Sequence, residues 1–142
     1  MLNVQKVETK RQLDEAYDIR KIVFVEEQKV PIEEEMDEHD DTATHFIGYN
    51  LERRPVAASR LRLVDEYGKL ERICVLKEER DHGYGRDIIL AMEDHVKSKG
   101  FAKTKLNAQT YAEEFYKKLG YETVSCEFMD AGIPHVTMVK NL

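Results

Sequence analysis

Hydrophobic and polar residues recur at spacings that change along the chain, and each change predicts a new element. Loose alternation over 2–7 predicts a strand, and apolar residues at helical spacing predict a helix over 10–24. Thr9 and Gln12 have the spacing of a capping box that begins this helix. Three strand-like runs follow, at 44–51, 56–64 and 70–76, with turns between them at 52–55 and 66–69. Consecutive strands joined by short turns predict an antiparallel meander.

The second half of the chain alternates helices with strands. Apolar residues at helical spacing predict a helix over 86–99, which Gly100 ends as a C-cap. Three elements follow: a strand at 104–109, a short helix from a capping box of Thr110 and Glu113 to Gly120, and a hairpin of strands at 121–129 and 133–140. Because a helix separates the strands at 70–76 and 104–109, they should pair in parallel through a right-handed crossover. The order predicts a mixed sheet with helices on both faces.

The segment 26–41 breaks this pattern, since nine of its sixteen residues are acidic and Pro31 interrupts regular structure. We expect a loop or a short irregular helix there. Four side chains could be considered as metal ligands: Asp37, His39, Asp40 and Asp41. The segment lacks the glycine and the terminal glutamate of a calcium-binding loop, so no metal is expected. Its carboxylates then either form a solvated surface or attract an amine.

Composition and charge narrow the class of protein. A chain of 142 residues, 42% hydrophobic and 35% charged, predicts one globular domain over residues 1–142. The net charge of -6 argues against a nucleic-acid partner and favours an amine-bearing one, because binding phosphates requires a basic surface. No window approaches the ~20 apolar residues of a membrane span, so no membrane partner is expected. Cys74 and Cys126 lie in strand-like runs and no apolar leader follows Met1, which favours a reducing, cytoplasmic location.

The loop Arg80-Asp81-His82-Gly83-Tyr84-Gly85 joins the predicted strand at 70–76 to the helix at 86–99. Two glycines let backbone N–H groups approach an anion, and the helix N-terminus and an arginine add positive charge. The same glycines could merely cap the helix or form a turn. The third glycine of a dinucleotide-binding fingerprint and the Gly-Lys-Ser/Thr of a P-loop are both absent, so those two kinds of phosphate site fit the loop less well.

A second motif, Phe115-Tyr116-Lys117-Lys118-Leu119-Gly120-Tyr121, lies about 30 residues further on. Together with the Arg-x-x-Gly-x-Gly spacing of Arg80, Gly83 and Gly85 and with the element order, it makes nearly the whole chain resemble the GNAT family of N-acetyltransferases. A narrower resemblance, to the ElaA-like or YjcF-like branch, rests on these residues: Arg20, Val23-Phe24-Val25, Glu27-Gln28, Val30-Pro31, Glu35, Asp37, Asp40, His45, Ala108-Gln109 and Gly132-Ile133-Pro134-His135.

This resemblance implies a mixed α/β (α+β) fold, a three-layer α-β-α sandwich with a mixed, largely antiparallel sheet of about seven strands. It also implies acetyl-CoA as co-substrate. The main chain of Ile73, Cys74 and Val75 would bind the pantetheine arm between two strands that splay apart. The remaining cofactor positions are the N–H groups of Asp81, His82, Gly83, Tyr84, Gly85 and Arg86 around the pyrophosphate, with Arg80 beside them, and Asn107, Gln109 and Tyr116.

The implied reaction is direct attack of an amine on the thioester, with Tyr116 as the acid that protonates the leaving thiolate. The glutamate that acts as base in better-known members is replaced by Thr104. Glu71 is the first candidate base, and His45 and His135 are alternatives, since histidine suits proton relay. Each of these residues has a structural alternative: core packing for the tyrosine, an ion pair for the glutamate, a hydrogen-bonded role for the histidines.

We therefore expect an acetyl-CoA-dependent N-acetyltransferase that acts on a small-molecule or peptide amine. The expected acceptor-site residues are Arg20, Glu27, Gln28, Glu35 and His135. An acyl-cysteine intermediate on Cys74 is the alternative to direct transfer. Two other classes stay open, a non-catalytic CoA or acyl-CoA sensor and an acidic interaction protein. A homodimer formed through an exposed sheet edge is also open.

Overall fold

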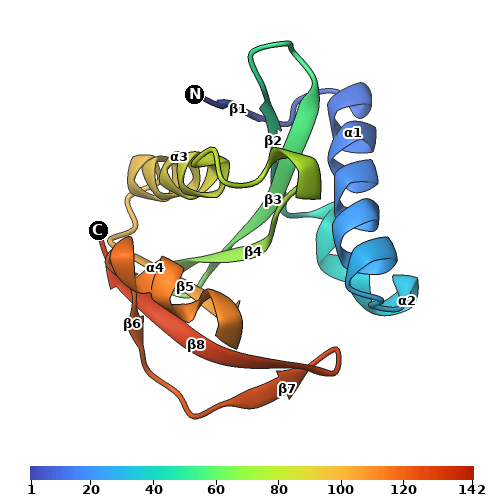
Figure 1. Ribbon diagram of the computed structural model, residues 1–142. Coiled ribbons are helices and arrows are strands. Elements are labelled where there is room, and N and C mark those ends of the chain that lie inside the picture. The colour runs from blue at the N-terminus through green and yellow to red at the C-terminus, as the bar shows by residue number, and fades with distance from the viewer.

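An eight-stranded mixed sheet runs through the centre of the computed structural model, which describes residues 1–142 (Figure 1). Its strands are β1 (Asn3–Lys6), β2 (Thr44–Tyr49), β3 (Pro55–Val64), β4 (Tyr67–Val75), β5 (Lys103–Gln109), β6 (Glu122–Thr123), β7 (Phe128–Asp130) and β8 (Ile133–Asn141). They lie in the order β1-β2-β3-β4-β5-β8-β6, with β7 paired to β8. Only β4 and β5 pair in parallel, as the intervening helix predicts.

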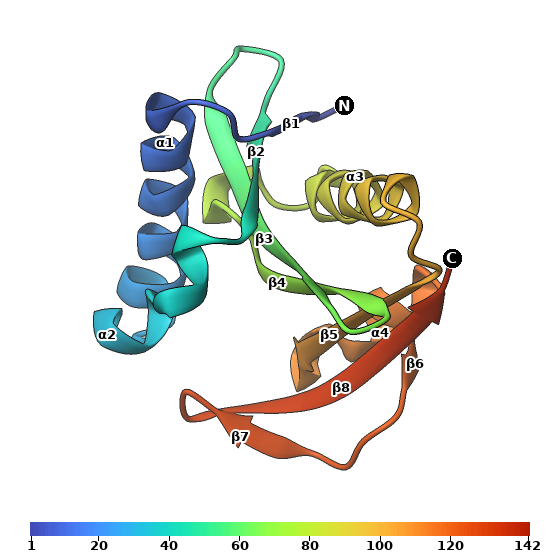
Figure 2. The ribbon, with the colours of Figure 1, turned by 180° about the vertical axis from the view of Figure 1, so that it is seen from behind.

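Helices cover both faces of the sheet (Figures 1 and 2). The helical elements are α1 (Lys10–Arg20), the π-helical η1 (Lys21–Glu27), α2 (Ile32–Glu35), the 3₁₀ turns η2 (Glu38–Asp41), η3 (Lys77–Glu79) and η4 (Thr110–Ala112), α3 (Tyr84–Ser98) and α4 (Glu113–Lys118). Helix α1 packs on β2 and β3, and α3 packs on β3 and β4 from the opposite face. The predicted α-β-α sandwich is confirmed. None of the helices has the length and apolarity that crossing a bilayer requires.

One cluster of 22 buried apolar residues joins the layers. The inward faces of β2, β3 and β4 contribute Ile47, Leu61 and Leu70, and α3 contributes Ile88 and Met92. Each of these side chains is no more than 2% exposed, so removing it from water stabilises the fold by about 1.5–3 kcal/mol. Apolar periodicity in the sequence therefore identified the faces that form the core.

Three local predictions were wrong. The predicted turn at 66–69 is a two-residue turn at 65–66, and β4 already begins at Tyr67. The predicted strand 121–129 divides into β6 and β7, because the Ser125 hydroxyl accepts a hydrogen bond from Thr137 N–H where a strand carbonyl would accept one. This division gives eight strands instead of about seven. No capping box begins α4, since Glu113 accepts from the Thr123 hydroxyl instead.

Two other boundaries bear on the site. Thr9 and Gln12 form the predicted capping box, but the first helix does not end near residue 24: it changes to a π-helix that reaches Glu27. The acidic segment 26–41 contains the end of η1, α2 and η2, as the prediction of short irregular helix requires. These short elements stand over one face of β3 and β4.

Strand β4 bends away from β5, and this divergence positions the site. Arg72 and Ile73 stand opposite the single residue Ser59 of β3, which is the arrangement of a β-bulge, and Arg72 has a φ of 55°. A bulge bends the strand that carries it. β4 pairs with β5 only from Gly68 to Leu70, so the edge from Glu71 to Val75 has no strand partner on that side.

Candidate active site

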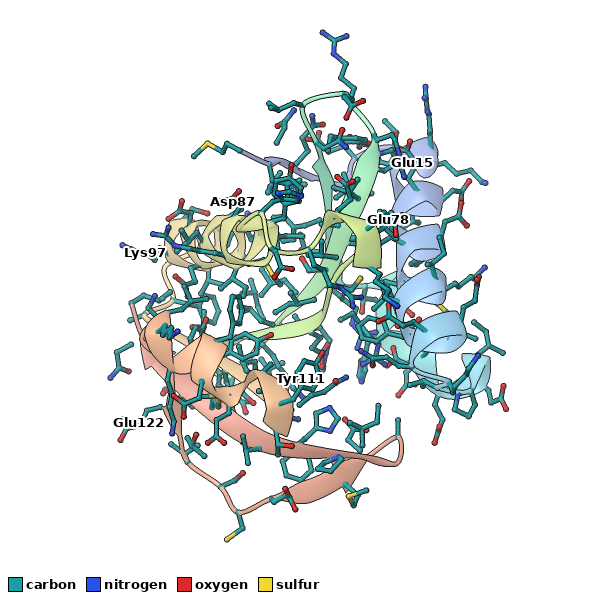
Figure 3. The ribbon with its side chains drawn as sticks, viewed as in Figure 1. Glu15, Glu78, Asp87, Lys97, Tyr111 and Glu122 are labelled. Atoms are coloured by element: carbon teal, nitrogen blue, oxygen red, sulfur yellow. The ribbon has the colours of Figure 1, made fainter.

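A cavity of about 530 Å³ lies where β4 and β5 diverge. Its wall is formed by η1 and the segment after it, by β3, β4 and β5, by η4 and α4, and by the β7–β8 hairpin. Tyr111, which Figure 3 labels, reaches the cavity from η4 with 80% of its surface exposed. Segments from almost the whole length of the chain therefore surround one volume that is large enough for a small ligand.

The glycine loop leads directly from β4 and η3 into α3. Gly83 is the N-cap of α3 and has a φ of 78°, a conformation that glycine adopts without cost. A Cβ added at Gly83 would meet nothing within 4 Å, so its conformation and not its packing requires glycine. None of the six backbone N–H groups from Asp81 to Arg86 donates a hydrogen bond within the protein. Six free donors at a helix N-terminus form a suitable site for an anion.

Arg80 is held beside this loop by Glu27. Its Nη1 and Nη2 atoms donate to the two Glu27 carboxylate oxygens at 2.7 Å each, and its Nε donates to the Val75 carbonyl at 3.0 Å. The hydrogen bond from Arg80 lowers the pKa of Glu27. The carboxylate is thus held by Arg80 and does not line the cavity, so its place in the acceptor wall stays a prediction.

The three residues expected along the pantetheine arm lie on the unpaired edge of β4. Ile73 lines the cavity, and Val75 has its carbonyl bound by Arg80. The Cys74 thiol is buried and contacts the Ala58 carbonyl at 3.6 Å, and burial raises its pKa to about 12. A thiol that stays protonated at neutral pH is a poor nucleophile, which argues against the acyl-cysteine route.

Tyr116 lines the cavity from α4. Its ring packs edge to face against Phe115 and Tyr121, and burial raises its pKa, so the hydroxyl keeps its proton at neutral pH. The two alternatives for Tyr116, core packing and a role as acid, are compatible, because the ring packs against the core while the side chain also borders the cavity. A buried, protonated phenol beside a ligand cavity can donate a proton.

Asn107, Gln109 and Gln28 also border the cavity. The Gln109 amide donates to the Gln28 amide oxygen at 2.8 Å, a contact that connects the end of β5 to the residue after η1. The Asn107 amide oxygen accepts from the Thr137 hydroxyl at 2.9 Å. The three side chains are therefore positioned by neighbours on different elements.

Of the three carboxylates that the acidic segment contributes to the cavity wall, Glu35 and Asp37 are bound by arginines, and only the exposed Glu34 is free to meet an amine. Arg20 donates to Glu35 at 3.1 Å and to Asp40 at 2.7 Å, and Arg60 donates to Asp37 at 2.7 Å and to Asp40 at 3.0 Å. The pKa of Asp40 falls to about 2 because Arg20 and Arg60 stabilise its charged form despite burial. These carboxylates neutralise buried arginines.

Two predicted acceptor residues belong to this network. Arg20 is fully buried and does not line the cavity, so a direct contact with an acceptor stays a prediction. Glu35 does border the cavity, but it is only 2% exposed and its carboxylate binds Arg20 and Arg72. Both residues connect α1 and α2 to the sheet instead of offering a free charge to a ligand.

The three candidate bases differ sharply in their surroundings. Arg60, Arg62 and Lys69 all pair with Glu71, and they lower its pKa to about 2. This is the ion-paired alternative for that residue, and it leaves a very weak base. His45 does not border the cavity, and its Nε2 lies 2.9 Å from the Asp40 carbonyl.

His135 is the remaining candidate, and it does border the cavity. Its Nδ1 lies 2.6 Å from the Ile133 carbonyl, and its ring stacks on Phe128. Thr104, at the position of the missing glutamate, is fully buried with its hydroxyl 2.9 Å from the Tyr121 hydroxyl. Thr104 itself has no basic group, and its buried hydroxyl contacts Tyr121 instead of the cavity, so this position does not provide the base.

Sequence reasoning missed the cations of the cavity wall: Arg60, Arg62, Lys69 and Arg72. A signal existed for two of them, because Arg60 and Arg62 alternate along β3 and must share one face of the sheet. Arg72 gave no such signal, since it reaches the cavity only through the bulge.

Known proteins share both the sequence and the fold. Residues 13–142 match the family model described as Acetyltransferase (GNAT) domain. The uncharacterized N-acetyltransferase YjcF of Bacillus subtilis (strain 168) is 50% identical over 131 residues, which cover 92% of this chain and 93% of that protein. The crystal structure of Escherichia coli ElaA superposes with a TM-score of 0.87 at 23% identity, covering 99% of this chain and 100% of ElaA.

A GNAT family acetyltransferase from Elizabethkingia anophelis, solved with acetyl-CoA bound, has the same fold with a TM-score of 0.76 at 12% identity. The superposition covers 99% of this chain and 98% of that one. The resemblance is thus confirmed in sequence for YjcF and in fold for ElaA. With a family match over nearly its whole length and a relative at half identity, this chain belongs to the GNAT family and is an acetyltransferase.

Proposed function

We propose that this protein transfers an acetyl group from acetyl-CoA directly to the amine of a small molecule or peptide held in the cavity between β4 and β5. The observation that carries the proposal is the run of free N–H groups from Asp81 to Arg86, which follows the unpaired edge of β4 in the chain. The pyrophosphate of CoA fits the first feature and an extended, amide-containing arm fits the second. The Elizabethkingia protein, which has this fold, binds acetyl-CoA.

Tyr116 supplies the proton that the leaving thiolate needs. Direct transfer forms the N–C bond, breaks the C–S bond and releases CoA as a thiol, so one proton must reach sulfur. The tyrosine borders the cavity and holds its proton at neutral pH. The raised pKa of Cys74 supports direct transfer over a covalent acyl-enzyme.

The acceptor class, the assembly and the location stay predictions. The cavity wall combines ion-paired acids and cations with apolar surface from residues such as Phe24 and Ile73. Such a wall can contact both the polar and the apolar parts of an amine-bearing acceptor. The exposed edge strands β1 and β6 could pair two subunits. The free thiols of Cys74 and Cys126 fit a cytoplasmic, reducing compartment.

Binding of the donor is tested by thermal unfolding with acetyl-CoA and with CoA. A ligand at 100 times its Kd stabilises the folded state by about 2.7 kcal/mol, which raises the Tm of a chain of this size by roughly 5–10 °C. Gly83→Asp should lose most of this shift, because its carboxylate repels the pyrophosphate. Gly83→Asn is the matched control: it adopts the same left-handed backbone without the charge and should keep a larger part of the shift. No shift at millimolar ligand would contradict the donor site.

Turnover is tested by thiol release across a panel of alkylamines, amino acids and a lysine-containing peptide. Tyr116→Phe removes one hydroxyl and should lower kcat about 100-fold, as expected when a general acid is lost, while the thermal shift with CoA persists. Unchanged turnover would exclude Tyr116 as the acid. Thermal stabilisation by CoA without release from any amine would contradict the transfer and leave a CoA-binding protein.

A further inference from the structure

Transfer to an amine requires a base as well as an acid. An alkyl ammonium has a pKa of about 10.4, so near neutral pH its nitrogen lacks the lone pair that attacks the thioester. A base must therefore face the cavity, have a free lone pair and lie where an acceptor can reach it. One side chain of the cavity wall meets these three conditions.

Most titratable groups of the wall fail at least one condition. Glu71, Glu35 and Asp37 have their carboxylates bound by arginines. His39 lies on η2 with its Nε2 atom 3.7 Å from the exposed carboxylate of its neighbour Glu38, so this nitrogen is directed to a surface group instead of an acceptor in the cavity. The exposed Glu34 and Asp130 carboxylates stand at the rim, where solvent competes with any acceptor.

His135 borders the cavity, and one hydrogen bond of its ring determines which nitrogen has the free lone pair. Nδ1 lies 2.6 Å from the Ile133 carbonyl, and a carbonyl oxygen only accepts, so Nδ1 carries the hydrogen. In the neutral ring the lone pair is then on Nε2. That atom makes no hydrogen bond within the protein, and it is not among the fully buried polar atoms without a partner. Its lone pair is therefore open to a ligand.

The surrounding elements hold this ring in place. His135 is only 8% exposed, it stacks on Phe128 with 6.0 Å between ring centroids, and its strand position is opposite Gln109 of β5. A fixed ring with one tautomer and one open nitrogen resembles the base of a catalytic pair, in which the hydrogen bond of one nitrogen sets the role of the other.

We propose that Nε2 of His135 is the general base that removes a proton from the acceptor ammonium. This inference rests on the proposed acetyl transfer. The ammonium proton moves to Nε2, the freed lone pair of nitrogen forms the N–C bond, and the C–S bond breaks as Tyr116 protonates sulfur. Nitrogen then loses a second proton, which restores the tyrosine, and the imidazolium releases its proton to solvent through the cavity. The sum is ammonium plus thioester to amide, thiol and one proton.

Few other charges border this proton path. The elements packed against β8 bring Tyr111 from η4, Tyr116 from α4 and Asp130 from β7 to the cavity, while β5 contributes Asn107 and Gln109, which do not titrate. On the facing wall the arginines, Lys69, Glu35, Asp37 and Glu71 are paired with one another, and the exposed Glu34 is the carboxylate without an ion pair. A pH effect lost with His135 can therefore be assigned to that residue by comparison with variants of its neighbours.

The test compares His135→Gln with His95→Gln, a matched control on α3 whose ring packs on Phe46 away from the cavity. With the alkylamine that the wild type acetylates fastest, His135→Gln should lower kcat/KM at pH 7 about 100-fold, and the defect should shrink as pH rises and the amine deprotonates on its own. Hydroxylamine, which is largely neutral at pH 7, should react at similar rates with both variants. Added imidazole should restore part of the activity of His135→Ala.

The outcomes separate this inference from the proposed function. Absence of turnover in the wild type refutes acetyl transfer, whereas wild-type turnover that survives His135→Gln at pH 7 refutes only the base. A second measurement needs no turnover: ¹⁵N NMR of labelled histidine, recorded at a pH where the ring is neutral, should show the Nδ1–H tautomer for His135. An Nε2–H tautomer would overturn the proposal directly. In each variant the thermal shift with CoA reports whether the fold and the donor site are intact.

Discussion

At the scale of single residues, the partners of a side chain decide its role more than its type does. Glu35, Asp37 and Asp40 are carboxylates that an amine could bind, but each is already bound by an arginine. His45 and His135, the two histidines considered as bases, differ in the same way: Nε2 of His45 lies 2.9 Å from a carbonyl inside the protein, while Nε2 of His135 makes no hydrogen bond within the protein. What remains unbound in the folded chain is what can act on a ligand.

The buried ion pairs of Arg20 give the first prediction at this scale. Its side chain is 0% exposed, and the Glu35 and Asp40 carboxylates that it binds are 1% and 5% exposed. Arg20→Met keeps the side-chain length but leaves Asp40 with Arg60 alone and Glu35 with Arg72 alone, which should lower the free energy of unfolding by up to about 3–5 kcal/mol. Urea denaturation monitored by circular dichroism measures the change.

An exposed arrangement on the same helix serves as the comparison for Arg20. Lys10 pairs with Asp14 across 3.0 Å, but the two side chains are 87% and 57% exposed. Lys10→Met should change the free energy of unfolding by no more than about 1 kcal/mol, since exposed ion pairs are weak. Equal effects of the two substitutions would show that the buried pairs add nothing beyond surface electrostatics.

At the scale of elements, strand β4 connects the core to the site. Its first residues pair with β5 under α3, its bulge at Arg72 bends it, and its free edge then borders the cavity. Gly68 lies at the paired end, where a Cβ would collide with the Val96 side chain of α3. The close approach of α3 to β4 therefore depends on this glycine, in a place where the sequence predicted only a turn.

Gly68→Ala tests this contact between elements. The added methyl group must displace Val96 or move α3, and overpacking of this kind costs about 1–3 kcal/mol of stability. Gly85→Ala is the control, since its Cβ would lie 3.4 Å from Phe115, an ordinary contact, and its stability should change little. Thermal unfolding without ligand measures both, and equal Tm values would contradict the assigned packing.

Local periodicity was enough to predict the elements and the order in which they occur, because each helix and strand repeats its own apolar spacing. The glycine loop could also be placed, since its residues are adjacent in the chain. The partners of the charged residues could not be predicted: Arg60 binds Asp37 across 23 positions, and Gln28 binds Gln109 across 81. Such choices depend on how strands and helices stack, which no local spacing encodes. The division of β6 from β7 depends in the same way on one hydroxyl, that of Ser125.

At the scale of the whole molecule, ion pairs join the layers in addition to apolar packing. The arginine and carboxylate network runs from α1 through α2 and η2 to β3 and β4, and its last member, Glu71, borders the cavity. Because these groups are ionised in the folded state, the integrity of the acceptor wall and the stability of the chain should depend on pH together.

The acid limb of stability follows from Glu71. Its pKa falls from 4.5 to about 2 in the folded chain, because its ion pairs with Arg60, Arg62 and Lys69 outweigh burial. A lowered pKa stabilises the folded state fully above the unfolded value, and this contribution disappears as pH falls from about 5 to about 2.

The contribution of Glu71 to stability at pH 7 is on the order of 3 kcal/mol. Glu71→Gln should therefore be less stable than the wild type at pH 7, and the difference should shrink at pH 4 and fall to about a quarter of its pH 7 value at pH 2.5. Urea denaturation at the three pH values measures this convergence, with Glu114→Gln, whose side chain is 81% exposed, as a control that follows the wild type. Parallel pH profiles for wild type and Glu71→Gln would mean that this ion-paired carboxylate does not control the acid stability of the fold.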